Sequence, residues 1–149
     1  MGITIYADGG CSENPGPGGW ASIIEADGQE MRMSGAEPWT TNNRMELTAV
    51  IEALVKLREM KQLRTLPVEV VTDSQYVQRG ITAWVARWER NGWRTAARQP
   101  VKNKELWIRL KQLADERHIV WHWVRGHSGQ AGNEVCHRMA QAAIKQLGA

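Results

Sequence analysis

The sequence predicts an α/β fold with a mixed sheet, in which antiparallel and parallel strands lie side by side. Two short apolar segments, residues 3–7 and 68–72, have the composition of buried strands. Apolar residues recur at helical spacing between them, so a helical crossover joins the two strands and they run parallel. The dipeptide Asp27-Gly28 separates two further alternating segments and predicts an antiparallel hairpin in the same sheet.

Three strands and a turn are expected in the first part of the chain. Apolar and polar side chains alternate along residues 3–8, and because few charges interrupt this strand, we expect it to be central in the sheet. Residues 11–19 are dense in Gly and Pro and predict a turn. Residues 20–25 and 29–34 then form the hairpin, and residues 37–41 are expected to form a loop.

Helices are expected to make up most of the remaining chain. Asn42 or Asn43 is expected to cap the first helix. The apolar face of this helix consists of Leu47, Val50, Ile51, Leu54 and Leu57. Residues 75–117 also have a helical pattern, which is interrupted at Gly80, Gly92 and Pro100. A last strand is expected at residues 118–124 and a last helix at residues 133–147.

The composition limits the class of protein. A chain of 149 residues is long enough for one domain with its own core. Nineteen Lys and Arg residues against sixteen acidic residues give a net charge of +3, which favours a polyanionic partner. Cys11 and Cys136 have no metal-type spacing, so we expect free thiols in a reducing cytosol. No signal segment or membrane-spanning run is present, and we expect a cytoplasmic protein without membrane attachment.

Three acidic residues are expected to meet at one edge of the sheet. Asp8 follows the first strand and Asp73 follows the strand parallel to it, and ligands bind beyond such carboxyl ends. Glu46 lies in the first turns of the intervening helix. Singly, each acid has a simpler explanation as a turn former, a helix cap or a solvated side chain. Together they would raise one another's pKa unless a cation lay between them, and such oxygen ligands suit Mg²⁺ or Mn²⁺.

Several longer motifs follow one another along the chain. They are Asp8-Gly9-Gly10 with Asn14-Pro15-Gly16-Pro17-Gly18-Gly19, Thr41-Asn42-Asn43-Arg44-Met45-Glu46-Leu47, Thr72-Asp73-Ser74-Gln75-Tyr76-Val77, and Trp123-Val124-Arg125-Gly126-His127. In order and spacing they resemble bacterial ribonuclease HI, the type 1 RNase H, from about residue 3 to residue 144. The resemblance implies a ribonuclease H-like fold. Its five-stranded mixed sheet, an antiparallel meander of three strands plus two parallel strands, is flanked by helices in a single domain over residues 1–149.

The resemblance implies an activity as well. It is endonucleolytic hydrolysis of the RNA strand of RNA–DNA hybrids, leaving 5′-phosphate and 3′-hydroxyl ends, and we expect the protein to act as a monomer. Asp8, Glu46 and Asp73 match metal-binding carboxylates, which suits two Mg²⁺ or Mn²⁺ ions with substrate bound. His127 matches a mobile catalytic histidine, because an imidazole exchanges protons near neutral pH. Its simpler explanation is a surface histidine in a turn.

The resemblance also assigns residues to the hybrid. Asn14, Asn43 and Gln75 match positions near the minor groove, where side-chain amides can donate to and accept from the 2′-hydroxyl that distinguishes RNA. The positions that resemble those holding the DNA strand or its phosphate are Thr41, Asn42 and Asn103.

Basic and aromatic residues are interleaved along residues 79–104, where Glu89 is the only acid. The segment contains Arg79, Arg87, Arg90, Arg94, Arg98, Lys102 and Lys104, with Trp84, Trp88 and Trp93 among them. A solvated helical face with core tryptophans would have this composition too, but the density is typical of a nucleic-acid surface. The segment resembles the family's basic protrusion, in which Trp84 approaches the DNA strand. We expect the hybrid to contact Trp84, Arg87, Arg90, Trp93, Arg94 and Lys102.

Two positions depart from the family's pattern. Trp39 stands where relatives often have Arg, which predicts a weaker phosphate pocket. His137 stands where the family has its fourth carboxylate, and it could ligate a metal or only spare the site a negative charge. An alternative therefore stays open, a hybrid-binding module with impaired catalysis. A DNA nuclease or integrase of the same superfold fits less well, because those families lack the basic insertion. We favour the active enzyme, since every other catalytic position is kept.

Overall fold

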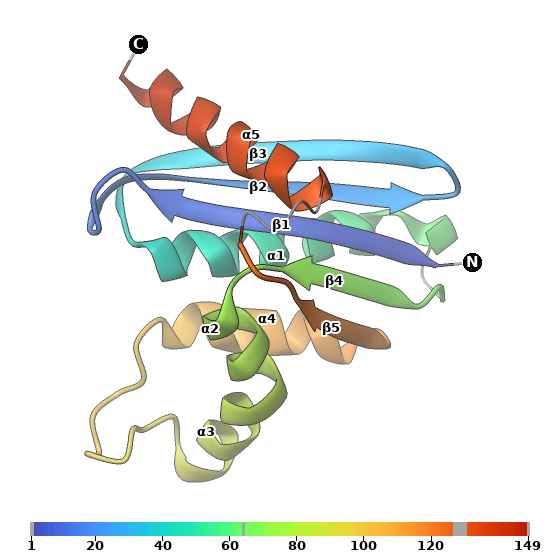
Figure 1. Cartoon of the computed structure of the whole chain (residues 1–149). Coiled ribbons are helices and arrows are strands. Elements are labelled where there is room, and N and C mark those ends of the chain that lie inside the picture. The colour runs from blue at the N-terminus through green and yellow to red at the C-terminus, as the bar shows by residue number, and fades with distance from the viewer. Residues whose placement is uncertain (1, 64, 127–130, 149) are drawn as a thin grey trace.

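The computed structural model describes residues 2–63, 65–126 and 131–148, which form a five-stranded sheet with helices on both faces (Figure 1). The strands are β1 (Ile3–Cys11), β2 (Gly16–Ala26), β3 (Gln29–Thr40), β4 (Val68–Thr72) and β5 (Ile119–Trp123), in the order β3-β2-β1-β4-β5. β2 is antiparallel to β1 and β3, whereas β4 is parallel to β1 and β5. The predicted mixed sheet and its central first strand are confirmed.

The helices cover the sheet unequally. They are α1 (Asn42–Glu59), α2 (Gln75–Arg79), a π-helical segment (Gly80–Trp84), α3 (Val85–Asn91), α4 (Lys104–Asp115) and α5 (Ala131–Leu147), with a short 3₁₀ helix at Lys61–Leu63. α1 and α4 pack together on one face, and α5 lies across β1, β2 and β3 on the other (Figure 1). In the described part of the chain, no helix is long and apolar enough to cross a membrane.

The core consists of two layers because the strands alternate. Ile3 and Ile5 of β1 are fully buried against Val50 and Leu54 of α1, in the larger of two apolar clusters. The opposite face of the sheet forms a smaller cluster under α5 that includes Ile23 of β2. Burying a side chain of this size stabilises the fold by about 1.5–3 kcal/mol. The sheet is therefore held from both sides, and its central strands form a rigid base for the residues at their ends.

The segment from α2 to α4 is fastened through one tryptophan. Trp107 of α4 is fully buried, and its Nε1 donates to Tyr76 Oη at 3.0 Å. Gly80 lies against the indole ring of Trp107, so a Cβ at this position would overlap the ring. Gly92, with φ of 79°, ends α3 in the left-handed region that glycine adopts without strain. The predicted interruption is confirmed at Gly92, whereas at Gly80 the chain stays helical and changes from α-helix to a π-helical segment.

Three local expectations were wrong at their boundaries. Residues 37–40 belong to β3 rather than to a loop; they were missed because this edge strand is mostly exposed and contains Pro38. The turn predicted over residues 11–19 is shorter, since Cys11 still pairs with Gly18. The cap of α1 is Thr41, whose Oγ1 accepts from the Arg44 amide at 3.2 Å, and not Asn42 or Asn43.

Candidate active site

Three carboxylates converge where the parallel pairing of β1 with β4 ends. Asp8 lies within β1, which continues to Cys11, so the expectation that Asp8 follows the first strand was wrong. Asp8, Glu46 and Asp73 each have an oxygen within 4.8 Å of an oxygen of the other two. The parallel pairing of β1 with β4 ends at Ala7 and Thr72, so Asp8 and Asp73 occupy equivalent places one residue further on. The topology of the sheet thus brings together acids that are 65 residues apart along the chain.

Gly9 allows Glu46 to reach this place from α1. The Gly9 amide donates to Glu46 Oε1 at 2.8 Å. A Cβ at Gly9 would overlap the backbone of Met45 and Glu46, so the first turns of α1 can approach β1 this closely only at a glycine. The sequence analysis named Gly9 only as part of the motif Asp8-Gly9-Gly10, whereas in the structure Gly9 lies within β1 and its amide positions a carboxylate.

Burial and mutual repulsion shape the electrostatics of the cluster. Asp8 and Glu46 are 5% and 8% exposed, and Asp73 is partly buried. Burial raises the pKa of Glu46 well above its ordinary value and the charges of Asp8 and Asp73 raise it further, whereas the Gly9 amide acts in the opposite direction. Burial and the charge of Asp8 raise the pKa of Asp73 to about 6. A divalent cation would relieve this repulsion, and the oxygen donors suit Mg²⁺ or Mn²⁺.

His137 and Asn133 bring α5 to the same place. His137 Nδ1 lies 3.1 Å from Asp8 Oδ2, while about half of the imidazole side chain remains exposed. Asn133 is buried, and its Nδ2 donates to the carbonyl oxygens of Ala7 at 3.4 Å and Val71 at 3.1 Å. This amide therefore fastens the start of α5 to β1 and β4. The sequence analysis gave Asn133 no role, because its partners are more than sixty residues away.

His127, the predicted mobile histidine, lies outside the described residues. The residue before it, Gly126, lies beside the cluster, since a Cβ at this position would be 3.3 Å from Asp73 Oδ2. Trp123 Nε1 donates to the Asp73 carbonyl oxygen at 2.9 Å. The end of β5 therefore holds the backbone of Asp73 in place.

Most of the asparagine and glutamine side chains that were predicted to contact the hybrid lie only a few residues from the three carboxylates in the sequence. Asn14 Oδ1 accepts from the Asn42 amide at 3.1 Å, and Asn42 Oδ1 accepts from the Cys11 amide at 2.7 Å. These bonds tie the turn between β1 and β2 to the start of α1. Asn14, Asn42 and Asn43 are exposed there, and Gln75 is exposed at the first position of α2. Exposed side-chain amides therefore stand on α1, which carries Glu46, and on α2, which begins two residues after Asp73.

A set of hydrogen bonds around Arg44 and Asn103 joins α1 to the start of α4. Asn103, with φ of 61°, accepts from Arg44 Nη1 at 3.2 Å and donates to Tyr76 Oη at 3.2 Å. Arg44 Nη1 also pairs with Glu105 at 2.6 Å. The predicted phosphate-side residue Asn103 therefore contacts a guanidinium that the sequence analysis did not single out. Arg44 stands in a recognised motif, but nothing local indicated its partners.

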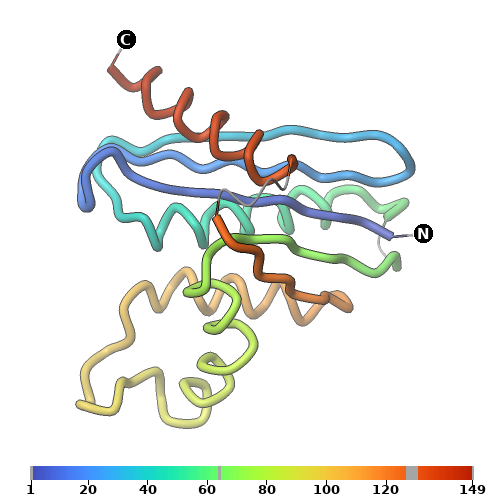
Figure 2. The backbone as a smooth tube through the Cα atoms, in the orientation of Figure 1, coloured from blue at the N-terminus to red at the C-terminus, as the bar shows by residue number. Residues whose placement is uncertain are grey.

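The basic segment projects beyond the β5 side of the sheet (Figure 2). Trp84 and Trp93 are partly buried and both contact Trp88, with ring centroids 5.9 and 6.0 Å apart. Packing among the tryptophans therefore stiffens the segment, and these ring contacts do not involve its basic side chains. Its exposed basic residues include Arg87, Arg90, Arg94 and Lys102.

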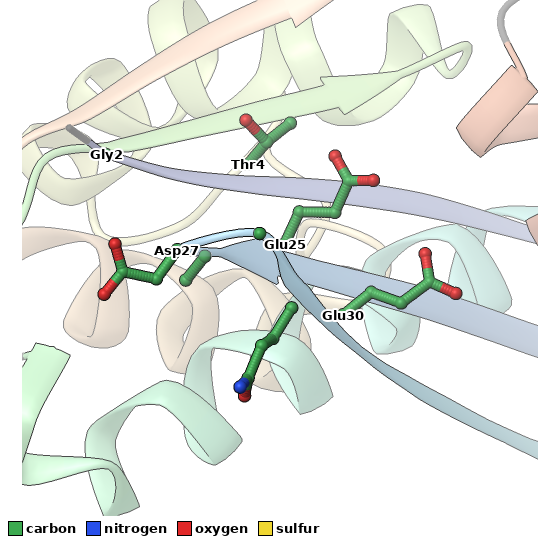
Figure 3. A pocket seen from close by; sticks show the side chains of 8 residues that line it. Gly2, Thr4, Glu25, Asp27 and Glu30 are labelled. Carbon is green, nitrogen blue, oxygen red and sulfur yellow. The ribbon is translucent and has the colours of Figure 1, made fainter.

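A surface hollow of about 500 Å³ lies at the opposite end of β1 (Figure 3). Its lining includes Gly2 and Thr4 of the first strand region together with the hairpin residues Glu25, Asp27 and Glu30. Because β1 runs from this hollow to Asp8, the hollow is separate from the carboxylate cluster.

Comparisons with known proteins agree over nearly the whole chain. The RNase H family model matches residues 1–145. Ribonuclease H of Cupriavidus necator is 51% identical over 146 residues, covering 98% of this chain and 97% of that protein. Ribonuclease H of Nitrosococcus oceani is 51% identical over 142 residues, covering 95% and 93%.

Solved structures show the same fold. LC9-RNase H1, described as a type 1 RNase H with the type 2 active-site motif, superposes with a TM-score of 0.84 at 34% identity, over 97% of this chain and 72% of that chain. LC11-RNase H1 in complex with RNA/DNA hybrid gives a TM-score of 0.76 at 25% identity, covering 99% of each chain.

Proposed function

This chain belongs to the ribonuclease H family of metal-dependent endoribonucleases, and from this premise we propose that it hydrolyses the RNA strand of RNA–DNA hybrids. Family membership confirms the resemblance and the fold that the sequence predicted. The observation that carries the proposal is the carboxylate cluster where the pairing of β1 with β4 ends, with its oxygens within 4.8 Å. We propose that residues 1–149 act as a single domain and as a monomer.

Asp8, Glu46 and Asp73 would hold the metal, Mg²⁺ or Mn²⁺. When bound, two such ions would activate the attacking water and stabilise the leaving 3′-oxygen, giving 5′-phosphate and 3′-hydroxyl ends. The protein contributes fixed ligand positions: the Gly9 amide holds the Glu46 carboxylate, and Trp123 holds the backbone of Asp73. Because the ligands are placed before substrate arrives, little reorganisation accompanies the reaction.

Two histidines would act at the same site. His127 would transfer a proton to or from the reacting groups, and the position of Gly126 beside Asp73 supports this role. His137, whose Nδ1 lies 3.1 Å from Asp8 Oδ2, would ligate a metal or only spare the site a negative charge. An imidazole adds no negative charge to the metal-free cluster when it stands in place of a carboxylate.

The hybrid would lie across the amides and the basic segment. Asn14, Asn43 and Gln75 are exposed and would exchange hydrogen bonds with 2′-hydroxyl groups, which DNA lacks. The residues proposed for the DNA strand and the phosphates are Thr41, Asn42, Trp84, Arg87, Arg90, Trp93, Arg94, Lys102 and Asn103. The hybrid complex of LC11-RNase H1, which shares this fold, supports hybrid binding.

One observation favours a second candidate function, a hybrid-binding module with impaired catalysis. The observation is His137, which replaces the carboxylate that the resemblance leads us to expect. Family membership and the intact group of three carboxylates favour the active enzyme instead.

Cleavage of matched duplexes tests the proposal. An RNA–DNA hybrid, a double-stranded RNA and a double-stranded DNA of one sequence are incubated with the protein and Mg²⁺ or Mn²⁺. We expect internal cleavage of the hybrid's RNA strand alone, with fragments that carry 5′-phosphate. Cleavage of DNA would indicate a general nuclease, and tight hybrid binding without cleavage would support the impaired module.

A further inference from the structure

We propose that Trp39 is a substrate contact: its indole packs against a sugar face of the DNA strand of the hybrid. The inference rests on the proposed function and extends it to a residue at which this chain departs from the resemblance. It replaces the expected ionic contact of an arginine with an apolar one. The expectation of a weaker phosphate pocket stands, and the inference adds an apolar contact at the same position.

The exposure of Trp39 is the first observation. Its side chain is 72% exposed, whereas the other exposed large hydrophobic residues in the described part of the chain, Val120, Trp123 and Leu147, are 41–42% exposed. An indole that remains largely in water contributes little to the stability of the fold. Covering it with a ligand would remove a large apolar area from water, which is favourable.

The position of Trp39 is the second observation. It precedes Thr40, which is 3% exposed and pairs with Gly16, and Thr41, which caps α1. Asn42 is three positions further along the chain, so the two Cα atoms are at most about 11 Å apart. The end of β3, the turn between β1 and β2 and the start of α1 lie together at one end of the molecule (Figure 2). The backbone of Trp39 therefore lies within reach of amides proposed to contact the hybrid, at an irregularity of β3 between the pairs Gly18–Glu37 and Gly16–Thr40.

The apolar character of the indole indicates which part of the hybrid Trp39 contacts. The bases of a duplex are paired and stacked, so an aromatic side chain at its surface meets the sugars and phosphates first. Deoxyribose lacks the 2′-hydroxyl and presents a more apolar face than ribose, which favours the DNA strand as the partner of an indole. Exposed Arg87, Arg90 and Arg94 supply the attraction to phosphates, so Trp39 adds a contact that does not depend on charge.

Binding measured across salt concentrations separates these two kinds of contact. The parent is the full chain with Asp73→Asn, which prevents cleavage, and its Kd for a hybrid is measured between 50 and 300 mM salt. Trp39→Ala should weaken binding about 5-fold or more without changing the salt slope, by analogy with aromatic contacts to single strands. Trp39→Arg should bind with a slope steeper by about 0.9, as expected for one added phosphate contact.

Two controls complete the experiment. Val120→Ala, which shortens another exposed hydrophobic side chain, should bind like the parent. Double-stranded RNA, which has no deoxyribose, should bind equally well to the parent and to Trp39→Ala. Because Trp39 is so exposed, the melting temperature of Trp39→Ala should match that of the parent, which excludes a folding defect as the cause.

The outcomes distinguish the inference from the function on which it rests. Unchanged hybrid affinity in Trp39→Ala, or an equal loss for the hybrid and for double-stranded RNA, would overturn the inference alone. A shallower salt slope in Trp39→Ala would also overturn it, because the contact would then depend on charge. If the parent itself does not bind the hybrid, the proposed function fails and the inference fails with it.

Discussion

Replacing Asp73 by Asn should stabilise the metal-free protein, although it removes a proposed metal ligand. Asp73 shares its site with Asp8 and Glu46, whose oxygens lie within 4.8 Å. Burial and the charge of Asp8 raise the pKa of Asp73 from 3.8 to about 6. The folded state therefore favours protonated Asp73, and ionising this carboxyl group at neutral pH lowers the free energy of unfolding. Asparagine keeps the shape of the side chain and removes the charge.

The magnitude follows from the difference between the two pKa values. An upper limit is about 3 kcal/mol, at about 1.4 kcal/mol for each tenfold change in proton affinity. Because Asp73 is only partly buried, solvent screening reduces this to roughly 1–2 kcal/mol. The penalty is absent below pH 3.8, develops as the pH rises, and is complete above a pH of about 6. At pH 7 the variant should melt about 3–6 °C higher than the wild type.

Denaturant unfolding in a chelator, between pH 4 and pH 7, measures this difference. We expect the advantage of Asp73→Asn to appear only towards pH 7, and Mg²⁺ to stabilise the wild type more than the variant. Asp115→Asn, at an exposed carboxylate paired with Lys111, is the matched control and should not gain stability. A variant that is no more stable than the wild type at pH 7, or a difference independent of pH, would refute the reasoning.

Three further changes have defined outcomes. Replacing Arg87, Arg90 and Arg94 together by Ala should weaken hybrid binding at all sequences and flatten the salt slope by up to about 0.9 per lost contact, with the loss in KM rather than kcat; an unchanged slope would mean that these residues form only a solvated face. His137→Asp should lower the stability of the metal-free protein by about 1 kcal/mol and reduce the Mg²⁺ needed for cleavage; identical melting and metal titrations would show that His137 has neither effect. Gly9→Ala should cost about 1–3 kcal/mol of unfolding free energy and reduce cleavage, because its methyl group overlaps the start of α1; wild-type stability and activity would contradict the assigned role of Gly9.

The parts of the fold that were predicted correctly are those with one buried face. Ile3 and Ile5 alternate with polar residues because β1 packs α1 on one side, and Leu47 and Leu54 recur at helical spacing for the same reason. The end of β3 had no such pattern, since residues 37–39 are exposed. The cap of α1 was misplaced because Thr41, Asn42 and Asn43 are all good capping residues, and only the hydrogen bond to the Arg44 amide distinguishes them.

Part of the candidate site could also be predicted from the sequence, for a different reason. The ends of parallel strands meet, so the proximity of Asp8 and Asp73 could be predicted from the order of strands and helix. The place of His137 came from the resemblance, since its contact with Asp8 spans 129 positions. The contacts of Arg44 with Asn103 and Glu105 span 59 and 61 positions. No local pattern encodes such contacts, and only the packing of α4 on α1 creates them.

The central claim, that the carboxylate cluster is a metal-dependent catalytic centre for hybrid cleavage, is tested most directly by comparing binding and cleavage in Asp73→Asn. Hybrid affinity and the single-turnover rate of RNA cleavage are measured for wild type and variant, with Mg²⁺ and with Mn²⁺. We predict hybrid affinity within about twofold of wild type and a cleavage rate lower by orders of magnitude, because the change removes a proposed metal ligand without altering shape. An Asp73→Asn protein that retains most of the wild-type cleavage rate would contradict the claim.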